Sequence, residues 1–265
     1  MTNNSDGLTP TLRPQLGVGW NRALPAPFGF DNGIVPDGIN DYLSVPNNQS
    51  NPLPLSGSIE FWTKDSNYRV GFNFRDNVNS LTFGLNGFPN NGGSVLFGNL
   101  NNFQVNPYGS LGGSSVWNVT GLYHWVVAWD MSARLLHLYK NTALTTTTIS
   151  GGALTQTGYD VLQIGNSSIS YFNYKMDELR IYRKMLSKAE VLLNYNSGAG
   201  ENPCETEFLT HWYKFEQFEN LDFSALQDNS DIRLGIRDLS GNNNHAQPVN
   251  MDTNPASPTY VLQPF

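Results

Sequence analysis

The sequence is poor in cysteine and in charge, and each shortage excludes a class of protein. Cys204 is the only cysteine among 265 residues, so the chain can form no internal disulfide and no cysteine-based zinc site. Charged residues make up 14% of the chain, the formal net charge is −7, and no cluster of lysine and arginine offers a surface to phosphate groups. We therefore expect no nucleic-acid partner.

Signals for membranes and for secretion are also lacking. No stretch approaches the roughly 20 apolar residues that a membrane-spanning helix needs. The N-terminal residues MTNNSDGLTPTLRP contain neither the basic region nor the apolar core of a usual signal peptide. The sequence thus predicts no membrane insertion. It suggests a protein that is cytoplasmic, released by another route, or packaged into a particle.

Short strand-like runs dominate the chain from Phe28 onward. They are separated by clusters of glycine, asparagine and proline, and the chain has 25 glycines and 15 prolines. Many short strands with frequent turn signals predict an all-β protein, either a sandwich or a barrel. The runs are GSIEFWTK, YRVGFNF, SLTFGLN, YHWVVAWD, RLLHLYKN, VLQIGN and DELRIYR.

One short helix is predicted after Leu186. Ser187 and Glu190 have the spacing of a capping box, in which each side chain binds the other residue's backbone amide. Val191 and Tyr195 continue an apolar stripe at helical spacing. Such a short helix depends on packing rather than on propensity for its stability. Gly198 is the predicted stop.

Three segments are expected along the chain. Residues 1–24 are polar, with prolines at positions 10 and 14 and a third just beyond at 25, and they predict an extended arm; a disordered terminus is the alternative. Residues 25–198 contain the strand-like runs of the sandwich. Residues 199–265 form a linker followed by the strand-like THWYKFEQFE. This last segment is too short for a second sandwich, so we expect it to complete the first.

An aspartate begins the strand DELRIYR. Alternation places Asp177 on the same face as Leu179 and Ile181, which is the face expected to point into the core. A buried carboxylate needs partners. These are backbone amides, a cationic side chain or a metal ion, and the local sequence leaves all three open.

Five blocks resemble, in wording, order and spacing, consecutive pieces of a LamG-like domain, which is the laminin-G/pentraxin-type branch of the concanavalin A-like jelly rolls. The most specific block continues from the last core strand into the short helix. The resemblance covers about residues 28–197. It implies an all-β fold, an antiparallel β-sandwich of the jelly-roll type. The blocks are DGINDYLSVP (37–46), GSIEFWTK (57–64), YHWVVAWD (123–130), LQIGN (162–166) and MDELRIYRKMLSKAEVLLNYN (176–196).

The order of the last pieces departs from this family. A strand like HWYKFE and a loop like DLSGNNNHA usually precede the first block, but here they occupy 211–216 and 238–246. Either the domain is circularly permuted or the tail begins a truncated second repeat. We favour permutation, because a lone strand cannot bury its apolar face and an open sheet edge invites aggregation.

The resemblance also implies a structural calcium ion. Members of this family often hold Ca²⁺ between the DLSGN-type loop and the aspartate that opens the last strand. Carried over, the ligands are Asp177, Asp238, Asn242 and Asn244, which supply the oxygen atoms that calcium prefers. The alternative is that Asp177 only caps turn amides and that the loop is a solvated turn.

Catalysis finds little support in the sequence, and we predict no enzyme. Glycoside hydrolases on related folds use two carboxylates roughly 5–5.5 Å or 6.5–9.5 Å apart, and the sequence has no E-x-D-x-x-E pattern. Glu60 is a single acid among apolar residues. The four histidines, at positions 124, 137, 211 and 245, have no zinc-ligand spacing.

Binding is the more plausible activity. Sugars stack on aromatic rings and bond to polar groups in loops carried by a rigid scaffold. The alternative for each ring is a loop anchor packed on the sandwich. The candidate ligand-binding residues are Phe88, Phe103, Tyr108, Tyr171 and Phe172.

Two main hypotheses for function follow. The first is a protein of the phage virion surface, a capsid decoration or fibre component, with lectin-like binding to host glycans. The chain begins at Met1, lacks a signal peptide, carries a fold common outside cells, and has an arm suited to docking on capsid or tail subunits. The second is a free, extracellular carbohydrate-binding or adhesion module; a glycoside hydrolase trails both. A homo-oligomer fits either hypothesis.

Overall fold

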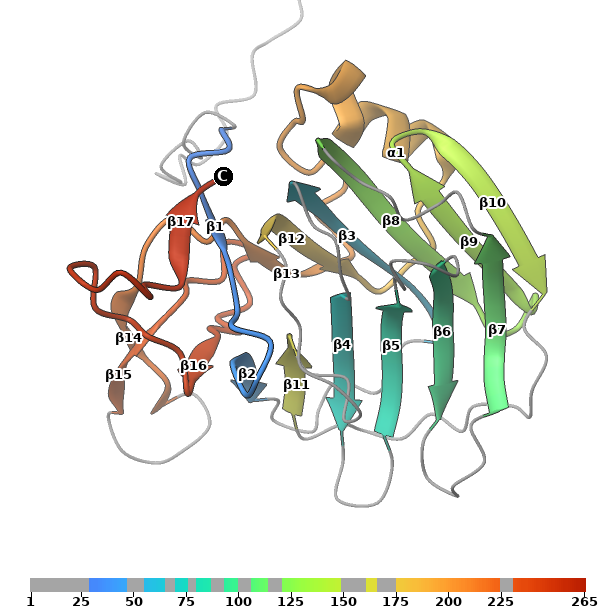
Figure 1. Ribbon diagram of the computed structural model, residues 1–265. Helices are drawn as coiled ribbons and strands as arrows, with labels where there is room; N and C mark the ends of the chain where they lie inside the picture. The colour runs from blue at the N-terminus through green and yellow to red at the C-terminus, as the bar shows by residue number, and fades with distance from the viewer. Residues whose placement is uncertain are drawn as a thin grey trace, which may run out of the picture.

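Two antiparallel sheets lie face to face in the computed structural model of the chain (Figure 1). One short helix lies on the outside of the sandwich, and the predicted fold class is confirmed. The structure describes residues 29–46, 55–64, 70–75, 80–86, 93–99, 106–113, 121–148, 161–165, 175–224 and 231–265.

The first sheet, which we call sheet A, has the strand order β10-β9-β8-β3-β12-β1-β17, and β13 also pairs with β12. All of these pairs are antiparallel. The bounds are β1 (Asn32–Ile34), β3 (Ser56–Lys64), β8 (Leu122–Asp130), β9 (Leu135–Lys140), β10 (Ala143–Thr148), β12 (Lys175–Tyr182), β13 (Leu209–Tyr213) and β17 (Leu262–Pro264).

The second sheet, sheet B, has the order β16-β2-β11-β4-β5-β6-β7, and a separate hairpin joins β14 to β15. The bounds are β2 (Tyr42–Pro46), β4 (Val70–Arg75), β5 (Ser80–Asn86), β6 (Gly93–Asn99), β7 (Asn106–Gly113), β11 (Val161–Ile164), β14 (Glu219–Asp222), β15 (Ile232–Gly235) and β16 (Gln247–Val249).

The core lies between the two sheets and follows from strand alternation. In β2, β3 and β8, alternate residues are apolar and buried there. Strand β3 contributes Ile59 and Phe61, and β2 contributes Leu43 and Val45. The largest rings in this layer are Trp125 and Trp129 of β8.

The helix α1 (Lys188–Tyr195) packs on the outer face of sheet A. Its predicted capping box is present: the Ser187 hydroxyl accepts from the Glu190 amide at 3.3 Å, and Glu190 accepts from the Ser187 amide at 2.7 Å. The helix ends at Tyr195 and is capped by Asn196 (φ 44°), and the predicted stop Gly198 lies in the 3-10 turn that follows, η1 (Asn196–Gly198). In the part of the chain that the structure describes, no helix is long and apolar enough to cross a membrane.

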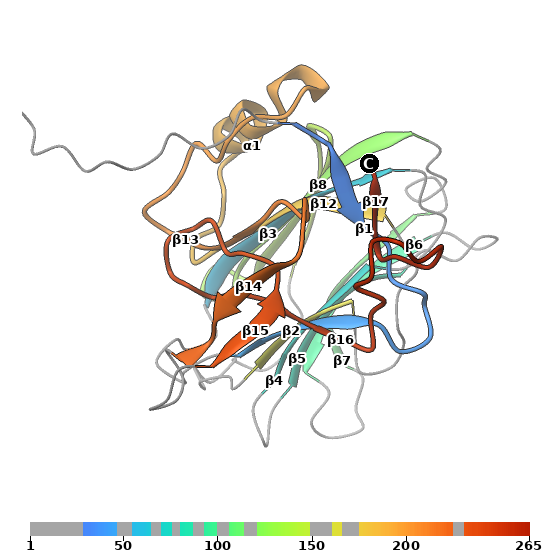
Figure 2. The same ribbon diagram turned by 90° about the vertical axis from the view of Figure 1, so that its left-hand side faces the viewer.

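The C-terminal segment adds strands to both sheets. Strand β13 pairs with β12, β17 pairs with β1, and β16 pairs with β2, so the last part of the chain lies against the first (Figure 2). The loop 238–246 lies beside β13, where the Leu239 amide donates to the Trp212 carbonyl at 2.8 Å. The domain boundaries at residues 24 and 198 stay predictions.

Strand β12 departs from the predicted alternation at its start. The register with β3 shifts between Asp177 and Arg180, and Glu178 adopts a left-handed backbone with φ 51°. The bulge places Met176 and Leu179 both in the core. Asp177 lies opposite Trp62, on the outer face of sheet A. The prediction that Asp177 shares a face with Leu179 is therefore wrong, because an extra residue resets the alternation.

Candidate functional site

The predicted calcium ligand Asp238 is a structural cap in the loop 238–246. Its Oδ1 accepts from the backbone amides of Trp212 and Ser240, both at 2.9 Å. Its Oδ2 accepts from the Ser240 hydroxyl at 2.8 Å and from the Asn244 amide at 3.0 Å. Since each oxygen already accepts two hydrogen bonds, this carboxylate is poorly suited to a cation.

Asn242 and Asn244 fasten the same loop to β13. Their side-chain amides donate to the Thr210 carbonyl at 3.2 and 2.9 Å. His211, on the same strand, is buried, and burial lowers its pKa to about 4 although the nearby Asp238 charge opposes this shift. These hydrogen bonds hold the loop 238–246 against β13.

Asp177 has a different set of neighbours. It is fully buried, and its Oδ1 accepts from the Glu178 amide at 2.7 Å. Its Oδ2 has no hydrogen-bond partner among the described residues. Burial, and then the charge of Glu178, raise the pKa of Asp177 well above its ordinary value. Of the four predicted ligands, Asp238, Asn242 and Asn244 therefore lie in one loop, and Asp177 lies in β12. Calcium binding stays a prediction, and the hydrogen bonds of these residues do not favour it.

A network of buried polar side chains lies between sheet A and α1. Glu60 of β3 is at its centre and accepts from the Tyr182 hydroxyl and from the Asn194 side-chain amide, both at 2.8 Å. Its Oε1 lies 2.6 Å from His124 Nε2, and Arg180 Nη1 lies 3.6 Å from Oε2, the oxygen that accepts from Tyr182 and Asn194. Burial alone would raise the pKa of Glu60, but the Arg180 charge and these hydrogen bonds outweigh it and lower that pKa.

Glu178 extends the network toward the C-terminal segment. Its carboxylate accepts from Trp212 Nε1 at 2.7 Å and from Arg180 at 3.1 Å, and Lys214 lies 3.1 Å from it. Arg180 also donates to the Glu201 carbonyl, beyond the helix. These contacts fasten α1, the segment after it and β13 to sheet A, and they leave both carboxylates buried.

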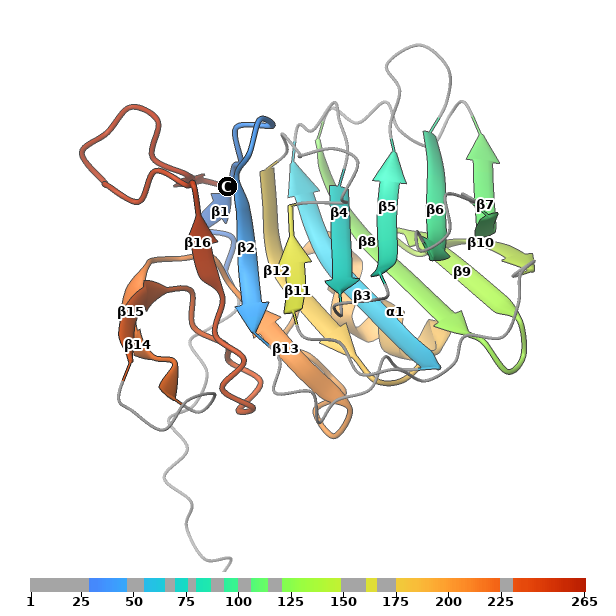
Figure 3. The ribbon, with the colours of Figure 1, turned by 90° about the horizontal axis from the view of Figure 1, so that it is seen from below.

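The outer face of sheet B has a different character. Tyr42, Ser44 and Pro46 of β2 are half-buried there, alternating with fully buried core residues. Figure 3 shows sheet B in front with α1 on the far side of the molecule. The backbone register sets six residues in one row across the sheet. They are Gln247, Ser44, Gln163, Asn73, Thr82 and Gly98; within this row Gln163 is buried, whereas Ser44 and Gln247 are half-buried.

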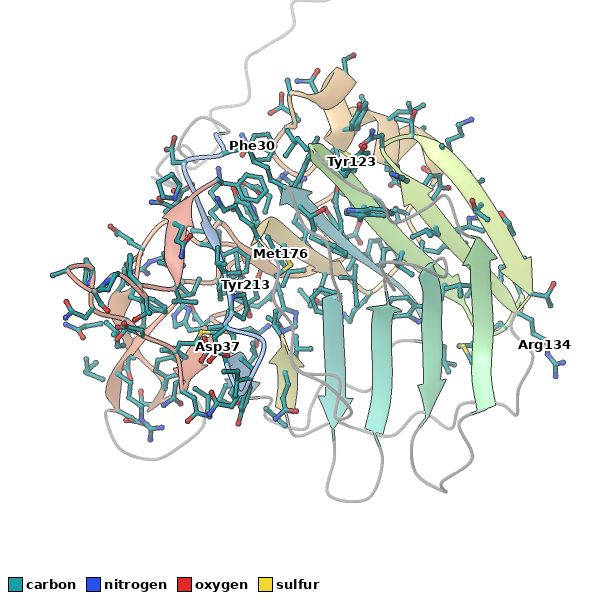
Figure 4. All side chains as sticks on the ribbon, in the orientation of Figure 1. Phe30, Asp37, Tyr123, Arg134, Met176 and Tyr213 are labelled. Atoms are coloured by element: carbon teal, nitrogen blue, oxygen red, sulfur yellow. The ribbon has the colours of Figure 1, made fainter. Side chains whose placement is uncertain are left out.

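A polar turn borders this face at the start of β2. Asp37 Oδ1 accepts from the amides of Ile39 and Asn40 at 2.7 and 3.2 Å, and Asp41 accepts from the Asp37 amide at 3.1 Å. Burial, together with the charges of Asp37 and Asp252, raises the pKa of Asp41. The side chain of Asn250 donates to the Asn40 carbonyl at 3.2 Å, which joins this turn to the segment after β16. Figure 4 shows Asp37 beside β2 and β16.

The predicted aromatic ligands are not tested by these contacts. Phe88, Phe103, Tyr171 and Phe172 lie outside the described residues. Tyr108 lies within β7, whose backbone alone is described. Tyr42, the aromatic residue on the outer face of β2, was not among the predicted ligand-binding residues. Its signal was present in the alternation of DYLSVP, where Leu43 and Val45 point inward.

The fold agrees with a comparison of the sequence with protein families. The model of the concanavalin A-like lectin/glucanases superfamily matches residues 37–192, which is more than half of the chain. The chain belongs to this superfamily. The match confirms the resemblance that the blocks from DGINDYLSVP to the helix indicated.

Solved structures of the superfamily fold are similar at low sequence identity. A candidate carbohydrate binding protein from Bacteroides ovatus has a TM-score of 0.52 and 16% identity over 84% of this chain and 59% of its own. A SAP-like pentraxin from Limulus polyphemus has a TM-score of 0.46 and 14% identity over 62% and 81%. Domains LG4-5 of mouse laminin alpha1 have a TM-score of 0.44 and 12% identity over 68% and 48%. No curated protein matches the chain in sequence.

Proposed function

We propose that this chain is a non-catalytic carbohydrate-recognition module that binds glycans on the outer face of sheet B, around β2 and β11. The observation that carries the proposal is the pair of half-buried residues Tyr42 and Ser44 on the outer face of β2, with the half-buried Gln247 of β16 in register beside Ser44. Membership of a superfamily of lectins and glucanases supports it. The localisation that accompanies this proposal is extracellular.

The chemistry of the face suits a neutral sugar. A sugar ring has an apolar C–H surface that stacks on an aromatic ring and hydroxyls that exchange hydrogen bonds with amides and other hydroxyls. Tyr42 offers the ring, and Ser44 and Gln247 offer polar groups beside it. Gly165 follows β11 close to Tyr42, and a Cβ there would lie 3.5 Å from the Tyr42 Cα. That distance is an ordinary van der Waals contact, and it is the φ of 96° at this position that favours glycine.

The described acids favour recognition over hydrolysis. A glycosidase needs two carboxylates that reach the same glycosidic bond. Glu60 and Glu178 have no exposed surface and are engaged by Arg180, and α1 lies over the face that carries them. These two groups would have to lose their ion pairs before they could meet a substrate. Their burial therefore opposes a hydrolytic role for them.

A free recognition module is favoured over the particle-surface hypothesis. The candidate glycan face belongs to the sandwich itself, within or beside the region that matches the superfamily. Neither the fold nor the similar structures provide support for capsid or tail subunits as partners. Cell-surface glycans are therefore the partners that we propose.

The test is a glycan-array screen of the intact chain, followed by titration calorimetry with the best oligosaccharide and its variants. We expect Tyr42→Ala to weaken binding at least tenfold, which corresponds to about 1.4 kcal/mol. Ser44→Arg should do the same by filling the face without removing a packed ring. Phe208→Ala is the matched control, since Phe208 is 38% exposed and precedes β13.

Circular dichroism spectra should show that all three variants are folded. Retention of wild-type affinity by both Tyr42→Ala and Ser44→Arg would place the glycan elsewhere. Failure of the intact chain to bind any glycan would remove the proposed function itself.

A further inference from the structure

Strand β15 carries an arginine that lies beside the proposed glycan face. Arg233 Nη1 donates to Gln247 Oε1 at 3.3 Å. Gln247 pairs in register with Ser44, and residues directly opposite each other in an antiparallel pair share a face of the sheet. Arg233 therefore borders the outer face of sheet B that carries Ser44. Figure 2 shows β14 and β15 next to β16 and β2.

A carboxylate holds the Arg233 guanidinium in a fixed orientation. Asp231 Oδ1 accepts from Arg233 Nε at 2.7 Å, and Asp231 Oδ2 lies 2.6 Å from Nη2. A bidentate pair of this kind fixes the plane of the guanidinium, which has five N–H donors. Asp231 and Gln247 engage three of these donors, and one on each terminal nitrogen has no partner among the described residues. The Arg233 side chain is 45% exposed, so a ligand can reach them.

We propose that Arg233 is a specificity-determining residue of the glycan face, and that its two remaining donors bind a pair of neighbouring hydroxyls on a neutral sugar. This inference rests on the proposed function, in which another sugar of the same glycan stacks on Tyr42. Two donors on one oriented plane match two oxygen atoms that are held side by side. Adjacent hydroxyls on a sugar ring have this arrangement. We call the position beside Arg233 the second sugar subsite.

The charges of the hairpin favour hydroxyls over an acidic sugar at this subsite. Asp231 balances the charge of Arg233. Arg237, which follows β15, donates from Nε to Glu219 at 2.9 Å and is paired in the same way. Asp222 adds a further negative charge, and its Oδ1 accepts from the Asp231 amide at 3.4 Å. Since the described part of the hairpin has no excess of positive charge, it does not attract a carboxylate.

The distance from Tyr42 places a different sugar unit at each residue. Tyr42 lies diagonally opposite Gln247, because the register pairs Tyr42 with Val249. Diagonal neighbours on a sheet are about 7–8 Å apart, and Arg233 lies beyond Gln247. A ring that stacks on Tyr42 thus leaves Arg233 to the next unit of the glycan. We expect the ligand to be an oligosaccharide.

The second sugar subsite belongs to the C-terminal segment. The superfamily match covers residues 37–192, whereas Asp231, Arg233 and Gln247 lie after it in the sequence. The same segment adds strands to both sheets, so its folding brings Arg233 to the border of the glycan face. The specificity would therefore be a feature that this segment adds to the sandwich.

Titration calorimetry with glycans of increasing length tests the second sugar subsite. The probes are the mono-, di- and trisaccharides that make up the strongest neutral glycan of the array. Arg233→Met should bind the trisaccharide about tenfold more weakly, since it loses two hydrogen bonds from a charged donor, and should bind the monosaccharide like the wild type. Arg233→Lys keeps the charge without the paired donors and should lose as much. Arg237→Met, the matched control, removes the other ion-paired arginine and should bind every probe like the wild type.

Three results would overturn the second sugar subsite. They are wild-type affinity of Arg233→Met or Arg233→Lys for the trisaccharide, an equal loss at every chain length, and an array on which acidic glycans bind more strongly than neutral ones. Circular dichroism spectra should show that the variants are folded. Tyr42→Ala separates the two proposals: if it weakens binding while Arg233→Met does not, the glycan face stands and only the subsite fails. An intact chain that binds no glycan would remove both.

Discussion

The outer faces of the two sheets have opposite roles although both follow the same strand alternation. On sheet A, α1 and the segment after it cover the face, and Ser58, Glu60 and His124 are fully buried. On sheet B, the outward residues of β2 stay half-exposed. The difference teaches that a polar residue on a strand is structural where another element covers it, and is available to a ligand where none does.

The covered face places strong demands on its polar groups. A buried charge must be paired and hydrogen-bonded, since removal of one partner leaves the other uncompensated in a low dielectric. Glu60 meets this demand with four different side chains. Ser44, which is half-buried on the outer face of β2, can satisfy its hydrogen bonds with water, so its identity is free to serve recognition.

The largest effect is expected from removing the centre of the covered network. Glu60→Ala would leave Arg180 and Tyr182 buried without their carboxylate, and such losses cost about 3–5 kcal/mol. Urea unfolding monitored by tryptophan fluorescence gives the free energy of unfolding. Glu207→Ala, at an exposed glutamate, is the control and should change it little. A loss below about 1 kcal/mol for Glu60→Ala would show that the network does not hold α1 in place.

A matched pair of serines compares the two faces directly. Ser58 on sheet A is buried, donates to the Lys184 carbonyl at 2.9 Å and accepts from the Leu186 amide at 2.8 Å. Ser58→Ala should lower the free energy of unfolding by about 1–3 kcal/mol, because it leaves buried backbone groups unpaired. Ser44→Ala on sheet B should stay within about 0.5 kcal/mol. Equal losses in the same urea experiment would contradict the distinction between the faces.

The smallest expected effect concerns pH at the start of β12. The pKa of Asp177 is raised in the folded chain, so the folded state holds a proton that the unfolded state has lost. Its contribution to stability therefore falls as pH rises from the unfolded value, near 4, through the folded value. Asp177→Asn should flatten the dependence of the melting temperature on pH across this range. An unchanged pH profile would mean that Asp177 is ionised in the folded state.

Local sequence signals were sufficient for the elements that depend on neighbours in the chain. The alternation in GSIEFWTK predicted β3, and the spacing of Ser187 and Glu190 predicted the start of α1. The same rules failed at Asp177, because the bulge at Glu178 depends on pairing with β3 and leaves no local mark. Tyr42 was missed for a related reason: alternation gives the face of a residue, and only the arrangement of the sheets shows whether that face is covered.

The sequence by itself determined the superfamily, the sandwich and the capped helix, since these follow from periodicity and short-range hydrogen bonds. The tertiary structure alone decided the partners of the chemistry-bearing residues. It placed Asp238 in a loop held against β13, buried Glu60 beneath α1 and left the outward residues of β2 half-buried. The physical reason is that burial, pairing and charge compensation depend on segments that lie far apart in the chain.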